Sequence, residues 1–292
     1  MVLVVGSTGF LGSAICKLLA DRKIPFRALV RKDSDKEKVS NLEKLGADLA
    51  VGDLKVPETL KAACEGVEKI ISTASTTFSR REGDTIDSVD RQGQLNLVEA
   101  AKRAGVKRFV YVSFRDCKEF PFPLNDAKRA VEKALAASGT TYTILRATCF
   151  MEAWLSPHLG FDYNEGKVRV YGTGEQKHSF ISLFDVAKFA VASLDNPAAG
   201  NQTIAIGGPE ALSWLEVVRV FEEVSGKKFE VEKLSIEALE QQKAAATNPL
   251  EASFAGLMLS VTLDWSVDIK PVLKSFPMKL TSVREYAKSV VG

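Results

Sequence analysis

Short apolar runs rich in β-branched residues alternate with amphipathic segments through the first half of the chain. The runs that predict strands are VLVVG (2–6), PFRALV (25–30), ADLAVGDL (47–54), KIISTA (69–74), RFVYVSF (108–114) and TYTILRA (141–147). Between them lie segments of helical spacing, such as LGSAICKLLADR and NDAKRAVEKALAAS, whose apolar residues recur every three or four positions. Near-continuous apolar strands separated by crossover helices are typical of a parallel sheet covered on both faces. The alternation therefore predicts an α/β, doubly wound parallel sheet.

The pattern changes after residue 150. Residues 151–176 combine aromatic residues and glycines without a clean period. The stretch DVAKFAVASL (185–194) predicts a helix with Asp185 at its N-cap, and QTIAIGG (202–208) predicts a short strand. We expect this helix and this strand to rejoin the main sheet.

The last part of the chain predicts helices around one strand-like stretch, KKFEVEKL (227–234). These patterns divide the chain into a dinucleotide-binding domain (1–150, rejoined by 177–208) and a smaller, mostly helical substrate lobe (151–176 and 209–292).

Composition narrows the function classes. The 292 residues include 39 basic and 37 acidic side chains, and this net charge of +2 gives no electrostatic reason to expect nucleic acid or an anionic membrane as partner. No apolar run approaches the roughly 20 residues that span a bilayer. The N-terminal MVLVVG enters a strand at once, and the four cysteines show no C-x-x-C spacing. Two histidines exclude a histidine-rich metal site. We expect a soluble, cytoplasmic protein with reduced thiols and no metal; the oligomeric state stays open.

The first strand runs into GSTGFLG, in which Gly6, Gly9 and Gly12 are spaced G-x-x-G-x-x-G. Glycines are needed where a strand-to-helix turn is tight and its backbone approaches a pyrophosphate, which then lies on the free N–H groups of the helix. The position of this triplet, after a strand and before an amphipathic helix, predicts dinucleotide binding. The residues predicted to contact the cofactor in this turn are Gly6, Ser7, Thr8, Gly9, Phe10, Leu11 and Gly12.

The end of the second strand indicates which dinucleotide binds. NAD-selective sites usually carry an acid there, whereas this chain has Arg31 and Lys32, with Asp33 close by. A guanidinium can pair with the 2′-phosphate of NADP, so we predict NADP (NADPH) as cofactor. The alternative is that these residues are solvated charges at the end of a strand. Further predicted cofactor contacts follow the third and fourth strands, at Asp53, Leu54, Ser72, Thr73 and Ala74. Asp53 is equally well explained as a carboxylate that stabilises its own turn.

Together these residues resemble a known family. The motifs that carry the resemblance are GSTGFLG, LVRK, GDL, NLVEAAKRAGVKRFVYVSF and ILRATCFME. In this order they are similar to the atypical short-chain dehydrogenases, nearest to the NmrA-like and isoflavone-reductase-like groups, over roughly residues 1–210. The resemblance implies a Rossmann fold, and it implies that Lys128 is the lysine kept in the middle helix and that Ser113 lies near the usual catalytic serine. The chain departs from that pattern at Leu124, where a tyrosine is usual, and at Ala147, where proline is frequent.

The chemistry that this pattern permits has several interpretations. Lys128 can contact the nicotinamide ribose, donate a proton, or be a solvated helix lysine. Helical spacing places it one residue from the apolar stripe, so it can border a cleft without being buried in the core. Tyr163, Tyr171 and His178 are alternative proton donors, although packing explains each of them better. A flat apolar substrate is indicated by aromatic and apolar side chains on the expected substrate side, although aromatic residues are also common in cores. These residues are Phe114, Phe150, Met151, Trp154 and Tyr163, together with Phe78, Phe120 and Phe161.

The sequence thus favours an NADP-dependent oxidoreductase that reduces a small apolar quinone, enone or carbonyl compound, with Lys128 and Ser113 as catalytic candidates. The alternative is a non-catalytic NADP(H)-sensing regulatory protein of NmrA type. A third, weaker hypothesis is an assembly protein that holds the nucleotide structurally.

Overall fold

A computed structural model describes residues 1–77 and 80–291 of the chain. Two compact units emerge from its contacts. The first consists of residues 1–114, 123–146 and 186–204, and the second of residues 115–122, 147–185 and 205–292.

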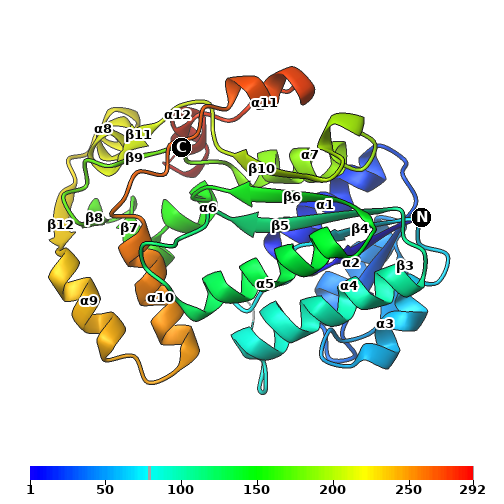
Figure 1. The fold of residues 1–292 in the computed structure, drawn as a ribbon. Helices are drawn as coiled ribbons and strands as arrows, with labels where there is room; N and C mark the ends of the chain where they lie inside the picture. Colours follow the sequence, from blue (N-terminus) through cyan, green and yellow to red (C-terminus); the bar gives the residue numbers. More distant parts are fainter. Residues whose placement is uncertain (78–79, 292) are drawn as a thin grey trace. The chain divides into compact units, whose positions relative to one another are not determined.

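The first unit is built on a twisted sheet (Figure 1). In the described part of the chain its seven strands lie in the order β10-β6-β5-β4-β1-β2-β3. They are β1 (Val2–Val5), β2 (Phe26–Val30), β3 (Asp48–Val51), β4 (Lys69–Ser72), β5 (Arg108–Phe114), β6 (Thr141–Ala147) and β10 (Gln202–Ile206). The pairs β1–β2, β1–β4, β2–β3 and β4–β5 are all parallel. The predicted doubly wound sheet is therefore confirmed, and the predicted strand 202–208 joins it beside β6.

Helices connect these strands. They are α1 (Phe10–Asp21), α2 (Lys36–Lys44), α3 (Pro57–Cys64), the π-helix η1 (Ile86–Gly93), α4 (Gln94–Arg103), α5 (Pro123–Ala137), α7 (Leu183–Ala192) and the 3₁₀ turn η3 (Pro197–Ala199). α3 packs against α4, and α4 packs against α5 on the same face of the sheet (Figure 1). Strand order reverses between β1 and β4, which is the place where open α/β sheets bind ligands at the carboxyl ends of their strands.

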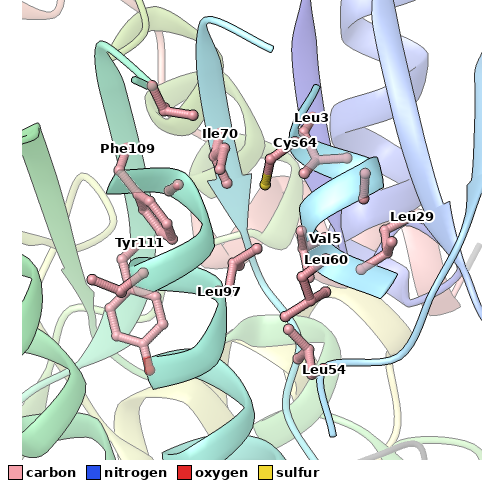
Figure 2. Packing of buried hydrophobic residues seen from close by; sticks show 14 of the residues in the cluster. Leu3, Val5, Leu29, Leu54, Leu60, Cys64, Ile70, Leu97, Phe109 and Tyr111 are labelled. Carbon is pink, nitrogen blue, oxygen red and sulfur yellow. The ribbon is translucent and has the colours of Figure 1, made fainter. Parts of the chain in front are cut away.

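An apolar core lies between the sheet and this layer of helices (Figure 2). Leu3, Ile70 and Phe109 contribute from three adjacent strands, and Leu60 and Leu97 close the core from α3 and α4; each is fully buried. Burying one such side chain stabilises the fold by about 1.5–3 kcal/mol. The core thereby fixes the carboxyl ends of β1 and β4, where the candidate site begins.

The second unit contains small sheets and helices. Its strands are β7 (Phe161–Asp162), β8 (Lys167–Tyr171), β9 (Lys177–His178), β11 (Leu212–Ser213) and β12 (Glu230–Leu234). Its helices are α6 (Met151–Trp154), η2 (Pro157–Leu159), α8 (Trp214–Ser225), α9 (Ile236–Ala244), α10 (Pro249–Ser260), α11 (Lys270–Ser275) and α12 (Val283–Val291). The strand-like stretch 227–234 becomes β12, which pairs in parallel with β8.

Residues 177–185 belong to the second unit. His178 in β9 pairs with Leu212 in β11, and the Asp185 carboxylate accepts a hydrogen bond from the Thr281 N–H. These contacts tie the segment to the second unit. The predicted N-cap role of Asp185 is wrong, because α7 already begins at Leu183 and places Asp185 inside its first turn.

All four cysteines are buried, and no disulfide joins them in the part of the chain that the structure describes. Among the described helices, none is both long and apolar enough to cross a membrane. The described His, Cys, Asp and Glu side chains form no group of three that could hold a metal ion.

Candidate functional site

The glycine-rich turn between β1 and α1 is compressed against its neighbours. Gly6 has a φ of +85°, and a Cβ at this position would lie 2.8 Å from both the Ala74 nitrogen and the Thr73 Oγ1. A Cβ on Gly12 would lie 2.0 Å from the Gly6 carbonyl oxygen. Only glycine permits this approach of α1 to β1 and β4. The structure thus brings the predicted residues Gly6, Gly12, Thr73 and Ala74 together.

Gly9 differs from its two partners in the motif. A Cβ on Gly9 would meet only the Gly6 carbonyl oxygen, at 3.2 Å, within the described chain. Gly9 is the N-cap of α1, and no side chain of the described residues caps this helix or places an acid in its first turn. The free N–H groups of the first turn and the partial positive charge of the helix end fit a pyrophosphate. The neighbouring Ser7 hydroxyl is buried and donates to the Leu29 carbonyl at 2.8 Å, while Phe10 is 77% exposed.

The end of β2 is cationic, as predicted, but its arginine is already paired. Arg31 Nη1 lies 2.6 Å from the Asp84 carboxylate, and Lys55 Nζ lies 2.6 Å from its other oxygen. Burial raises the pKa of Asp84, but the hydrogen bonds from Lys55 and Arg31 outweigh it and hold that pKa below the usual value. Asp33 forms an ion pair with Arg81, and the charge of Arg31 also helps to hold the pKa of Asp33 below its usual value.

An open pocket of about 390 Å³ adjoins these cations in the first unit. It is lined by Val30, Arg31, Lys32, Ser34, Lys36, Val39, Leu49 and Val51. Apolar walls with a basic rim suit a flat ring that carries a phosphate. The two predicted cations, Arg31 and Lys32, therefore lie at one pocket.

The residues that follow β3 and the end of β4 have structural partners. The Asp53 carboxylate accepts a hydrogen bond from the Lys55 N–H at 2.8 Å, which supports the interpretation of Asp53 as a turn residue. Leu54 is buried in the core of the first unit. The Ser72 hydroxyl donates to the Gln94 side chain, whose amide donates in turn to the Ala74 carbonyl.

Lys128 is buried, with 5% of its surface exposed, so the hypothesis of a solvated helix lysine is wrong. Its Nζ lies 3.9 Å from Asp90 Oδ1 and 5.0 Å from the centroid of the Tyr111 ring. The helical pattern of α5 placed Lys128 beside the apolar stripe but could not show that η1 and β5 cover it. Burial lowers the pKa of Lys128, and Asp90 is the strongest group that opposes this effect.

Ser113 and Leu124 are the other two positions that the resemblance aligns with catalytic residues, a serine and a tyrosine. Ser113 is buried, and its hydroxyl accepts a hydrogen bond from Arg129 Nη2 at 2.8 Å. Arg129 also donates to the Phe114 carbonyl. Leu124 lies in the first turn of α5 and is buried at 2% exposure, so its side chain packs as an ordinary apolar residue.

Sequence reasoning missed Asp90. Its carboxylate is fully buried in η1, and Oδ2 accepts hydrogen bonds from the Thr76 N–H at 3.0 Å and the Thr76 hydroxyl at 2.6 Å. A usable signal was present, because Asp90 shares the buried face of its helix with Ile86, Val89 and Gly93. An acid on an apolar stripe requires a partner, since burying an isolated charge is costly.

The candidate residues of the second unit contribute to its own packing. Met151 is fully buried, Trp154 packs edge-on against Tyr171, and Tyr163 stacks on Phe221. Burial raises the pKa of Tyr171 to about 12, and burial lowers the pKa of His178 to about 4. Phe150 is partly buried at the N-cap of α6, and Phe78 lies outside the described residues. The packing interpretation of Tyr171 and His178 is thus favoured over a role as proton donor.

The sequence of this chain is similar to the sequences of known proteins. Residues 1–287 match the NmrA-like family. The chain belongs to the NmrA-like family. It is 30% identical to the photosystem II assembly factor Ycf39 of Synechocystis sp. over 100% of this chain and 90% of that protein. It is 33% identical to an NAD(P)H azoreductase of Xenophilus azovorans over 85% of this chain and 80% of that protein.

Solved structures share the fold of this NmrA-like chain. The NADPH-dependent quinone oxidoreductase QOR2 of Escherichia coli, complexed with NADPH, superposes with a TM-score of 0.82 at 22% identity, and each chain is covered completely. This likeness confirms the Rossmann-type sheet with a smaller C-terminal region. The named relatives of the NmrA-like chain include both a reductase and an assembly factor.

Proposed function

We propose that this protein is an NADPH-dependent reductase of a small apolar quinone, enone or carbonyl compound. The observation that carries the proposal is the buried Lys128, whose ammonium lies beside the Asp90 carboxylate in the same unit as the glycine turn. A buried ionisable group with a specific charge partner is typical of a catalytic site.

The glycine turn would hold the pyrophosphate of NADPH, because the first N–H groups of α1 are free of side-chain caps in the described structure and Gly9 leaves space above them. Arg31 and Lys32 would hold the 2′-phosphate at the pocket beside β2. When bound, NADPH supplies a hydride to the acceptor.

Lys128 would supply the matching proton. Each reduction of a quinone or enone consumes one hydride and one proton, and the developing oxyanion is stabilised by a nearby ammonium. Leu124 provides no phenol, so the site favours acceptors whose reduced form is a weakly basic oxyanion. A quinone yields a phenolate, whereas a simple ketone yields a strongly basic alkoxide that needs a better acid. Phe114, partly buried at the end of β5, is a proposed apolar contact for such a ring.

The test is the loss of NADPH absorbance with panels of quinones, enones and simple ketones. We expect turnover of quinones or enones to exceed that of ketones by orders of magnitude. Lys128→Ala should lower this activity at least tenfold, while Lys133→Ala, which alters an exposed lysine of the same helix, should not. Robust ketone reduction that survives Lys128→Ala would contradict the proposal.

A second candidate function is favoured by the match to Ycf39 over the whole chain. In this case the protein would bind NADP(H) structurally and assist the assembly of other proteins. Tight binding of NADP⁺ and NADPH without turnover of any acceptor would support this candidate. A sharp difference in affinity between the two redox states, again without turnover, would support a sensor of the NADP(H) state.

A further inference from the structure

Asp90 is a buried carboxylate of which only one oxygen is engaged in hydrogen bonds. Oδ2 receives both Thr76 donors, and Oδ1 has no hydrogen-bond partner among the described residues. The cation that faces this free oxygen is Lys128, at 3.9 Å from Oδ1. Thr76 therefore fixes the orientation of the carboxylate, with the unused oxygen near the ammonium.

The helix that carries Asp90 is held at both ends. Thr85 and Ser88 form a reciprocal capping box at the start of η1. At its end, a Cβ on Gly93 would lie 2.8 Å from the Leu54 Cβ, so only glycine allows this approach. η1 is a π-helix, a form that is rare in proteins and is frequently found at functional sites.

Asp90 and Tyr111 lie near the Lys128 ammonium, and two charged groups of its own helix also act on its charge. Asp90 comes from η1, Tyr111 from β5, and Arg129 and Glu132 from α5 itself. The Glu132 carboxylate is shared by two guanidinium groups, at 3.0 Å from Arg129 and 2.5 Å from Arg146. Asp90, in contrast, forms an ion pair with Lys128 alone among the described cations.

We propose that Asp90 is a positioning residue that holds the Lys128 ammonium in place and keeps it charged for proton transfer to the reduced acceptor. This inference rests on the proposed function and adds a second residue to it. In the transfer, one N–H bond of Lys128 breaks and its electron pair stays on nitrogen, while the acceptor oxyanion gains the proton. Solvent then returns a proton to the amine beside Asp90. Without the carboxylate, burial and Arg129 would favour the neutral amine.

The experiment uses Asp90→Asn, which removes the charge but keeps the shape and an oxygen that can accept both Thr76 donors. Asp87→Asn is the matched control, because Asp87 lies in the same helix and is exposed to solvent. Asp90→Glu restores the charge. The pH dependence of kcat for quinone reduction is measured for each variant. The titration of the Lys128 side chain is followed in parallel by NMR of isotope-labelled lysine, with exposed Lys133 as reference.

The expected result is that activity falls with rising pH as Lys128 loses its proton, and that Asp90→Asn moves this fall about one to three pH units lower. The NMR midpoint of Lys128 should move by the same amount. Asp87→Asn should leave both midpoints in place, and Asp90→Glu should recover most of the shift.

Two results would overturn the inference. In one, Lys128 titrates in Asp90→Asn as it does in the unaltered protein; in the other, its NMR midpoint moves while the kcat profile does not. If Asp90→Asn fails to fold, the NMR titration of the unaltered protein still tests the inference. A neutral Lys128 at pH 7 in that protein would overturn the inference. The NMR titration requires no turnover, so a failure of the proposed function can be distinguished from a failure of this inference. If only the proposed function fails, no acceptor is reduced, but the NMR midpoint of Lys128 still moves in Asp90→Asn.

Discussion

Gly9 and Gly12 belong to one motif, but the structure predicts opposite consequences for their substitution. In Gly12→Ala the new Cβ would lie 2.0 Å from the Gly6 carbonyl oxygen and 2.6 Å from its carbon. These atoms are backbone, so they cannot move aside by a rotamer change. Overpacking of this kind costs about 1–3 kcal/mol or more. In Gly9→Val the Cβ meets the Gly6 oxygen at 3.2 Å and no other nearby atom of the described residues, and valine can adopt the extended backbone with its φ of −81°.

Gly9→Val should therefore fold with nearly normal stability and lose cofactor affinity. Each charge-assisted hydrogen bond to a phosphate that the valine side chain prevents is worth about 1.5–3 kcal/mol, which corresponds to a loss of about 10- to 150-fold in affinity. Gly12→Ala should lose stability first.

Chemical denaturation gives the free energy of unfolding of both variants, and NADPH titration by fluorescence gives their dissociation constants. The reasoning is refuted if Gly9→Val binds NADPH normally, or if Gly12→Ala is as stable as the unaltered protein. The first result would show that the pyrophosphate does not bind at this turn. The second would show that a Cβ at position 12 does not prevent the close approach of α1 to β1.

Three further predictions concern other groups. Arg31→Gln should reduce the affinity for NADPH at least tenfold more than the affinity for NADH, because a charge-assisted bond to the 2′-phosphate, worth about 1.5–3 kcal/mol, is lost. An equal loss of affinity for both cofactors in binding titrations would contradict NADP selectivity. Burial lowers the pKa of His178 to about 4, below its unfolded value of about 6.5. The neutral imidazole thus stabilises the fold by up to roughly 3 kcal/mol, fully above about pH 6.5 and progressively less as the pH falls toward 4. Urea unfolding of the unaltered protein and of His178→Phe checks this. A difference in their free energies of unfolding that does not change with pH would argue against it. Leu124→Tyr should raise the rate of ketone reduction more than the rate of quinone reduction, since it adds a phenol near Lys128. Turnover rates with the two substrate panels test this. An equal change in both rates would argue against a missing proton donor.

Much of the first unit was predictable because its strands are nearly continuous apolar runs. The prediction for 108–114 coincides with β5, and the prediction for 141–147 coincides with β6. Such strands are buried on both faces, so their composition alone marks them. The glycine turn was predictable because three glycines at this spacing, directly between a strand and a helix, are typical of a tight strand-to-helix turn. Asp185 was predicted as an N-cap, but the helix extends two residues further toward the N-terminus.

The strands, the glycine turn and the two cations that follow β2 were predictable, because each of them depends on residues that are neighbours along the chain. Which charges meet depends on the tertiary structure. Lys128 and Asp90 are far apart in sequence, yet the packing of α5 on η1 places their charged atoms 3.9 Å apart. Arg31 likewise meets Asp84 across the first unit. Periodicity predicts which face of a helix is buried, but it does not specify which other element covers that face. A buried charge acquires its ionisation state and its partner only when that element is in place.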